Sequence, residues 1–345
     1  MQTRLAVRAS AIAAAALAVG APAVLADSVA DFYKGKQITL VIPAGPGGSY
    51  GLYGQLGKAA LEKFLPGKPT VVMQFMPGSG GAKATNYIAT AAAQDGSVLL
   101  YNAEGAASQT QLFKPAAIRY DMAKFKYIGQ YAPAPAIISV WANAPATSIE
   151  GAKKAEVVLG ATGKGSQQYQ VPALLNALIG TKFKVITGYK GSRGLFHAIE
   201  NKEVHGGLAS TVSWSTIRPE WVPQAMVVPI FQTGGKAAKG FEKVPLVEDV
   251  SADPVVRQML RVTTSAAVMG RSMAAPPGIP ADRLAAIRAA FRQGMEDAEV
   301  SKLAAKLKLP IDYTSGENLE KQVREILATP KPVVEKLKTI LSIKG

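Results

Sequence analysis

Residues 38–65 read ITLVIPAGPGGSYGLYGQLGKAALEKFL, an apolar run, a break rich in glycine and proline, and then a helical pattern. The run 38–42 is almost continuously apolar, which is typical of a strand covered on both faces in a parallel sheet. Leu52, Leu56, Ala59 and Ala60 then recur at three- and four-residue steps, the spacing of one helix face. The stretch predicts a strand, a loop and a helix.

The loop 43–48 joins the carboxyl end of this strand to the amino end of this helix. Backbone N–H groups at a helix start lack partners within the helix, and the positive end of the dipole lies there too, so the loop suits an anion. Neither nucleotide motif fits, because Ala59 follows Lys58 where a Walker A loop has Ser or Thr, and Tyr50 stands where the dinucleotide motif needs glycine. The expected anion is therefore not a nucleotide phosphate. A plain glycine-rich turn stays an open alternative.

The composition and charge of the chain limit the classes of binding partner that we expect. The 345 residues suffice for two domains, and 39 basic residues against 24 acidic ones give a net charge of +15. The basic residues are spread along the chain without interleaved aromatic residues, so no nucleic acid partner is expected. A diffuse positive field suits small anions or an acidic partner surface, and equally a merely soluble surface.

The amino terminus has the pattern of an export signal. Arg4 and Arg8 precede an apolar stretch at 9–20, and small residues follow at 24–26. We expect residues 1–26 to be a signal peptide cleaved after about Ala26, which makes the mature protein periplasmic and leaves it a net charge of +13. The apolar part is too short for a membrane anchor, so the mature protein is not expected to span a membrane.

The sequence offers little for catalysis. It has no cysteine and only His197 and His205 as histidines, and it contains neither an HExxH nor a Gly-x-Ser-x-Gly motif. We therefore expect no enzyme activity, no metal and no cofactor. An extracytoplasmic enzyme with an unrecognised nucleophile is the alternative left open.

Strands and helices alternate along the first part of the chain. Strands are predicted at 70–75 and 98–102, with a helix at 83–93 between them. The β-α-β-α-β order with short connections predicts a parallel doubly wound sheet, whose loops at the carboxyl edge converge on one crevice.

An extended stretch at 125–141 is expected to cross into a second domain, where the alternation begins again. Its predicted strands lie at 157–160, 183–187, 204–209 and 226–231, with helices ending near 179 and spanning 195–201. Thr147 to Glu150 is expected to form a capping box. Pro172 is expected in the first turn of its helix or at a kink.

The rest of the chain is mostly helical. Helices are predicted at 254–262, about 284–295, 299–307, 317–328 and 333–342, with an extended segment at 268–274. A helical tail without strands is most simply placed on the first domain. The predicted domains are 27–130 plus about 241–345, and about 131–240.

Four segments together resemble the substrate-binding receptors of tripartite tricarboxylate transporters, the Bug family. They are FYKGKQITLVIPAGPGGSYGLYGQL (32–56), GKPTVVMQFMPGSGGAKATNYIATAAAQDGSVL (67–99), GATGKGSQQYQVPALLNALIGTKFKVITGYKG (160–191) and VMGRSMAAPPGIPADRL (268–284). The resemblance implies a type II periplasmic binding fold, two α/β domains joined by two crossing segments. It also implies a small carboxylate held between the domains and delivered to membrane transporter subunits. A receptor that feeds a membrane sensor kinase is the alternative.

Three positions depart from the family's pattern. Gly51 and Gln55 stand where the family usually has Asp and Arg, and His205 stands where it usually has Asp in a Glu-Val-Asp-Gly turn. Two carboxylates expected near the cleft are thus replaced. This favours a more anionic or larger ligand over one that carries an amine.

Candidate ligand contacts come from both predicted domains. They are Gly47, Gly48, Ser49, Tyr50 and Asn102 in the first, and Thr162, Gly165, Ser166, Gln167, Tyr189 and His205 in the second. They offer backbone donors, hydroxyls, amides and an aromatic cover. Glu104, near Asn102, is expected to face solvent or pair with a lysine, because an unpaired acid would oppose an anion. If His205 binds a carboxylate as the imidazolium, affinity should rise as the pH falls through about 6.5.

Overall fold

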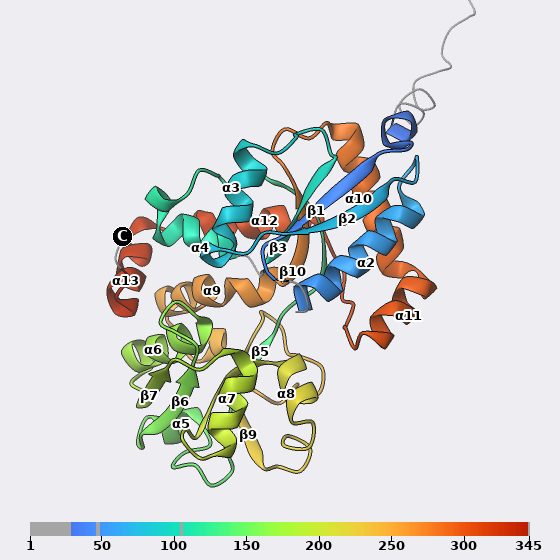
Figure 1. Ribbon diagram of the computed structural model, residues 1–345. Helices are drawn as coiled ribbons and strands as arrows, with labels where there is room; N and C mark the ends of the chain where they lie inside the picture. The colour runs from blue at the N-terminus through green and yellow to red at the C-terminus, as the bar shows by residue number, and fades with distance from the viewer. Residues whose placement is uncertain (1–28, 46–48, 104–105, 344–345) are drawn as a thin grey trace, which may run out of the picture.

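The computed structural model describes residues 29–45, 49–103 and 106–343, so the predicted signal peptide lies outside the described residues. Two mixed sheets, each flanked by helices, form two lobes (Figure 1). Helix α9 (Pro254–Met269) lies between the lobes. The expected α/β fold class with two lobes is confirmed.

The first sheet has six strands in the order β11-β4-β10-β3-β1-β2. They are β1 (Gln37–Ile42), β2 (Thr70–Phe75), β3 (Val98–Ala103), β4 (Lys126–Ala132), β10 (Arg271–Ala275) and β11 (Thr314–Ser315). β2, β1 and β3 are parallel as predicted, but β10 runs antiparallel to both β3 and β4, so the sheet is mixed. The prediction of a tail without strands is wrong at β11, which pairs with β4.

The second sheet has five strands in the order β7-β6-β8-β5-β9. They are β5 (Ala136–Trp141), β6 (Val157–Ala161), β7 (Phe183–Thr187), β8 (Gly206–Ser210) and β9 (Val227–Thr233). β7, β6 and β8 are parallel, whereas β5 runs antiparallel to β8 and β9. The carboxyl ends of the three parallel strands therefore share one edge.

Besides the helical residues 29–33, six labelled helices accompany the first sheet. They are α2 (Ser49–Phe64), α3 (Ala82–Thr90), α4 (Ala106–Phe113), α10 (Ala281–Glu296), α11 (Ala298–Lys306) and α12 (Gly316–Leu327). α2 and α10 lie side by side (Figure 1). Gly294 makes this possible, because a Cβ there would lie 2.1 Å from the Cβ of Ala60. Phe291 and Leu56 are fully buried in the same core.

Four helices accompany the second sheet, and the last helix of the chain packs on one of them. They are α5 (Ile149–Ala152), α6 (Gln167–Ile179), α7 (Gly191–Glu200) and α8 (Thr211–Ile217), with α13 (Lys331–Leu341) packed on α6. Short 3-10 turns occupy Ser79–Gly81, Pro115–Ala117 and Val247–Asp249. Ser148, not Thr147, caps α5, because its side chain accepts from the Gly151 N–H. Pro172 lies inside α6, beyond the first turn.

Helix α9 runs seven residues past the predicted end at Val262. Thr263 and Thr264 are buried, and their hydroxyls donate to the carbonyls of Met259 (3.0 Å) and Leu260 (2.9 Å) in the same helix. Such back-bonding satisfies hydroxyls that would otherwise be costly to bury. The apolar side of α9 packs on α6 in a shared core.

The two chain crossings lie against each other. Residues 133–135 lead from β4 to β5, and Gly270 leads from α9 into β10. The Ala134 N–H donates to the Ala267 carbonyl over 2.8 Å. Gly270 has φ = 50°, and a Cβ there would lie 2.2 Å from the carbonyl oxygen of Ala132, so only glycine fits this point.

Candidate functional site

The first-lobe candidates lie where α2 begins. Gly47 and Gly48 fall outside the described residues, and Ser49 is the first residue of α2. Tyr50 is half-buried, and its ring centre lies 5.4 Å from that of Tyr101 on β3. The ring of Tyr50 therefore extends an aromatic cluster of the first core toward the start of the helix.

Asn102 lies near the carboxyl end of β3 and is 2% exposed. Its side-chain amide donates to the Ser272 Oγ of β10 over 3.0 Å. One donor of Asn102 is thus used within the sheet. Glu104 lies outside the described residues.

The second-lobe loop 162–166 is partly satisfied by its own contacts. The Thr162 N–H donates to Gln168 Oε1 over 2.9 Å, and the Ser166 hydroxyl donates to the Gly163 carbonyl over 2.7 Å. Ser166 is the N-cap residue of α6, but its side chain makes no capping hydrogen bond. Gly165 is exposed, with open space where a Cβ would lie.

Helices α4 and α6, one from each lobe, contact the same point of α9. Gln167, from the start of α6, donates its Nε2 to the Thr263 carbonyl over 2.9 Å. Gln109, from α4 of the first lobe, donates its Nε2 to the same oxygen over 2.9 Å. Side chains from helices of both lobes therefore meet at one carbonyl of α9.

Tyr189 follows β7, at the edge of the second sheet where the carboxyl ends of its parallel strands lie. Its ring covers Gly160, where a Cβ would lie 3.1 Å from Tyr189 Cε2. The Tyr189 hydroxyl is 3.4 Å from Glu203 Oε2, and burial followed by this carboxylate raises the pKa of the phenol.

His205 does not join these residues. It precedes β8, and its Nδ1 accepts from the Val158 N–H over 2.9 Å, while its own N–H donates to the Val158 carbonyl over 2.8 Å. Val158 lies near the amino end of β6, three residues before its last residue, Ala161. At about 3.3 Å per strand residue, Val158 and the paired His205 lie about 10 Å from the Ala161 end of β6, where the loop at 162–166 begins. His205 is thus near the opposite edge of the sheet. Its imidazole completes the sheet hydrogen bonding there.

A cavity of about 460 Å³, which we call the hinge cavity, lies between the lobes beside the crossing segment 133–135. It is lined from the first lobe by α2, the start of β10 and residues 308–312, and from the second lobe by residues 210–215 and 234–241. Four basic side chains line it against one acid, Asp312. The basic residues are Lys236, Lys239, Arg271 and Lys308. The hinge cavity therefore carries positive charge between the lobes.

Arg271 is the most buried of these charges, with 7% of its surface exposed. Its guanidinium carbon lies 5.5 Å from the centre of the Tyr53 ring, a cation–π arrangement. Burial raises the pKa of Tyr53 to about 12, which Arg271 partly opposes, so Tyr53 is neutral and its hydroxyl donates to the Pro310 carbonyl over 2.9 Å. Lys236, at the wall of the hinge cavity, forms a 2.6 Å ion pair with Asp312.

Arg271, Tyr53 and the lysines of the hinge cavity are not among the residues predicted from the sequence. Arg271 directly follows Gly270 within the predicted extended segment 268–274, and that position was the only available signal. Tyr53 and Arg271 lie more than 200 residues apart in the chain, and the lysines come from two further segments, so no local pattern reveals the cavity.

The described residues contain no group of three or more His, Asp or Glu side chains placed to hold a metal ion. Within the same residues, none of the helices combines the length and apolar character needed to cross a membrane.

No protein-family profile matches the chain, and no curated protein matches its sequence. Solved structures do match. A TctC solute-binding protein from Polaromonas is 20% identical with a TM-score of 0.68, and the match covers 88% of this chain and 99% of that one. The periplasmic binding protein BugD is 19% identical with a TM-score of 0.61, covering 90% and 99%. MatC from Rhodopseudomonas palustris, solved with malate, is 18% identical with a TM-score of 0.61, covering 87% and 99%.

These three proteins match this chain over nearly their whole length, through both lobes. The chain therefore has the fold of the TctC and Bug periplasmic binding proteins.

Proposed function

We propose that this protein is an exported solute receptor of the Bug type, which closes its two lobes over a small carboxylate. The observation that carries the proposal is the positively charged hinge cavity, which is lined from both lobes and lies beside the crossings about which the lobes would move. Clefts of this kind concentrate anions. The ligand leaves chemically unchanged, because the receptor's task is binding and release.

The fold supports this reading. The matched MatC structure holds malate, a dicarboxylate. In this chain the ligand would face the cationic hinge cavity and the start of α6, where Gln167 contacts α9. Thr162, Gly165, Ser166, Gln167 and Tyr189 stay candidate contacts in the second lobe, and Ser49, Tyr50 and Asn102 in the first. We further propose that the closed form delivers the ligand to membrane subunits of a tripartite tricarboxylate-type transporter, from the periplasm.

Isothermal titration against mono-, di- and aromatic carboxylates and amino acids tests the proposal. We expect a dicarboxylate to bind more tightly than its monocarboxylate analogue, since the hinge cavity carries several positive charges. Binding of cationic compounds alone would overturn the proposal.

A charge-reversal pair tests the hinge cavity directly. The double variant Lys239→Glu/Lys308→Glu should weaken carboxylate binding by about 1–2 kcal/mol, about tenfold in Kd. The control Lys302→Glu/Lys306→Glu carries the same net charge change on exposed positions of α11. Equal affinity in both double variants would show that the ligand binds elsewhere.

A further inference from the structure

Much of the second-lobe wall of the hinge cavity is one long loop, residues 234–245, which we call the lysine loop. It follows β9 and forms neither a helix nor a strand. It carries Lys236 and Lys239, two of the four basic side chains that line the cavity. Most of its residues are exposed, so the loop has little apolar core of its own. Its shape therefore depends on polar contacts.

A single buried side chain supplies three of these contacts. Gln232, one residue before the end of β9, is 0% exposed. Its Nε2 donates to the carbonyls of Phe241 over 2.8 Å and Val244 over 2.6 Å, and its Oε1 accepts from the Ala238 N–H over 2.8 Å. A side-chain amide suits this task because it offers donors and an acceptor together. Three backbone groups of the lysine loop are thus bound to one amide.

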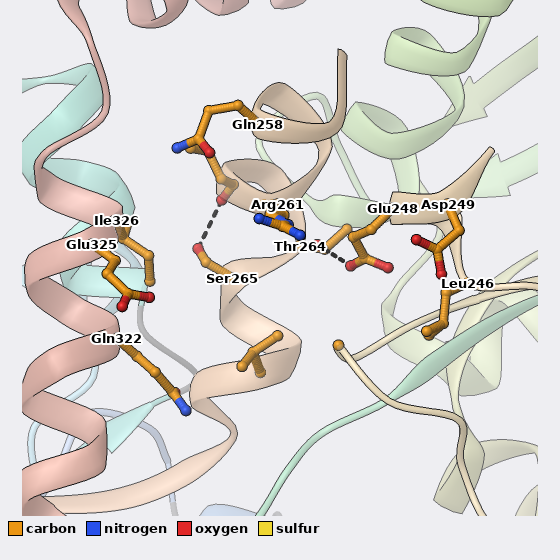
Figure 2. Close-up of a pocket in the computed structure, with 13 residues that line it drawn as sticks. Leu246, Glu248, Asp249, Gln258, Arg261, Thr264, Ser265, Gln322, Glu325 and Ile326 are labelled. Carbon is orange, nitrogen blue, oxygen red and sulfur yellow. Dashed lines mark hydrogen bonds between the residues drawn. The ribbon is translucent and has the colours of Figure 1, made fainter. Parts of the chain in front are cut away.

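The two ends of the lysine loop are held close together, as in a compact Ω-loop. The Gln232 N–H donates to the Pro245 carbonyl over 2.9 Å, and Gln232 also bridges to Leu246. Just beyond the loop, Figure 2 shows Glu248 directed at α9, where its carboxyl group accepts from the Thr264 hydroxyl. The ends are therefore fixed to the second sheet and to α9, and the Gln232 side chain fixes the part that extends from them.

The lysine loop also reaches the first lobe. The 2.6 Å ion pair joins Lys236 to Asp312 on the opposite wall of the hinge cavity. Asp312 is itself held on the first lobe, because its N–H donates to the Tyr131 carbonyl of β4 over 2.8 Å. Gln232 is not among the residues that line the cavity. It therefore determines from behind the wall where the lysines of the second lobe stand relative to the first lobe.

We propose that Gln232 is a positioning residue for carboxylate binding, which acts through Lys236 and Lys239. This inference rests on the proposed carboxylate function. A loop that is already ordered loses less conformational entropy when an anion binds, so its lysines hold the anion more tightly. Without the three hydrogen bonds the lysine loop would sample other conformations, and part of the binding free energy would be spent on ordering it.

Titration calorimetry with succinate, adipate and benzoate as probes tests this role. Gln232→Met keeps the length of the side chain but removes both donors and the amide oxygen. We expect it to weaken binding of the tightest of these probes by about three- to tenfold. Gln232→Glu is the second variant, since its carboxylate cannot donate to the two carbonyls, and it should weaken binding by a similar factor.

A double-mutant cycle separates positioning from a general loss of stability. In the background Lys236→Ala/Lys239→Ala, Gln232→Met should have almost no further effect on probe binding, because the lysines that it positions are absent. Hydrogen exchange measured without any probe should be faster over 234–245 in Gln232→Met than in the parent.

Asn176→Leu is the matched control. The Asn176 amide on α6 also holds a loop of the second lobe through three hydrogen bonds, which involve Thr181 and Phe183. That loop precedes β7, at the other end of the sheet order from β9. Asn176→Leu should leave probe affinity and the hydrogen exchange of 234–245 unchanged.

Several outcomes would overturn the positioning role. They are unchanged hydrogen exchange or parent-like affinity in Gln232→Met, equal weakening in Asn176→Leu, and a full effect of Gln232→Met in the background without the two lysines. Failure of the parent to bind any of the probes would contradict the proposed function itself, and the positioning role with it. That failure is recognisable because it is seen before any substitution is made.

Discussion

His205 gives the sharpest prediction about the site, because its sequence position and its contacts point to different roles. In the structure the His205 Nδ1 accepts from the Val158 N–H over 2.9 Å. His205→Ala would leave that partly buried N–H without its acceptor. Such a loss costs about 1–3 kcal/mol, and we expect a fall of that size in the stability of the second lobe.

The assay follows from the placement of the tryptophans. All three, Trp141, Trp214 and Trp221, lie in the second lobe and pack around Phe196 or one another. Urea unfolding followed by tryptophan fluorescence therefore reports this lobe. The midpoint should fall in His205→Ala, while carboxylate affinity and its pH dependence stay as in the parent.

Two variants isolate the cause. His205→Asn can present an acceptor oxygen near the position of Nδ1 and should recover most of the lost stability. His197→Ala removes an exposed histidine whose 3.6 Å contact with Glu200 lies at the surface, and it should change stability by less than about 0.5 kcal/mol. A His205→Ala protein as stable as His197→Ala, with weaker carboxylate binding that no longer varies with pH, would refute the structural role.

Three further predictions concern Gly270 in the crossing segment, the buried Glu248, and the contact between Gln167 and α9. Gly270→Ala should destabilise the protein by about 2–3 kcal/mol in thermal unfolding. Alanine is strained at this φ, and its Cβ would lie against the Ala132 carbonyl. An unchanged melting temperature would contradict the close approach of the two crossing segments. Burial raises the pKa of the Glu248 carboxyl above its ordinary value, so the native state binds the carboxyl proton more tightly than the unfolded state does, and this contribution to stability is lost as the pH rises above the ordinary carboxyl range. The stability of Glu248→Gln relative to the parent should therefore increase from pH 4 to pH 7. A difference in stability that stays constant over this range would contradict the raised pKa. Gln167→Ala removes one hydrogen bond to the Thr263 carbonyl and should lower the free energy of unfolding by about 0.5–1.5 kcal/mol. It should also weaken carboxylate binding, whereas Lys164→Ala, at a neighbouring exposed position, should leave carboxylate binding unchanged. Equal carboxylate affinity in the two variants would argue against a role for the contact between Gln167 and α9.

Much of the backbone could be predicted from local pattern. The strand at 70–75 and the strand at 183–187 have the predicted bounds, because alternating or continuous apolar residues end at glycine and proline on either side. The seven extra residues of α9 could not be predicted, because Thr263 and Thr264 disfavour a helix until their hydroxyls bond to carbonyls one turn back. β11 is too short to leave a pattern.

The candidate site was less accessible to such reasoning. A residue that precedes a parallel strand lies at the edge away from the crevice, and His205 could have been placed there from its position before Gly206 alone. Arg271 and Lys308 could not, since their approach depends on how α11, β10 and the crossings pack. For the tail, an amphipathic pattern shows that one face of α13 is buried, but not that its partner is α6.

Mass spectrometry of small molecules released from the natively purified protein would show whether the protein binds a carboxylate. We expect a compound with one or more carboxylates, present in near-stoichiometric amount and displaced when the same compound is added in isotopically labelled form. Release of a nucleotide or of a purely cationic compound as the main stoichiometric ligand of the hinge cavity would contradict it.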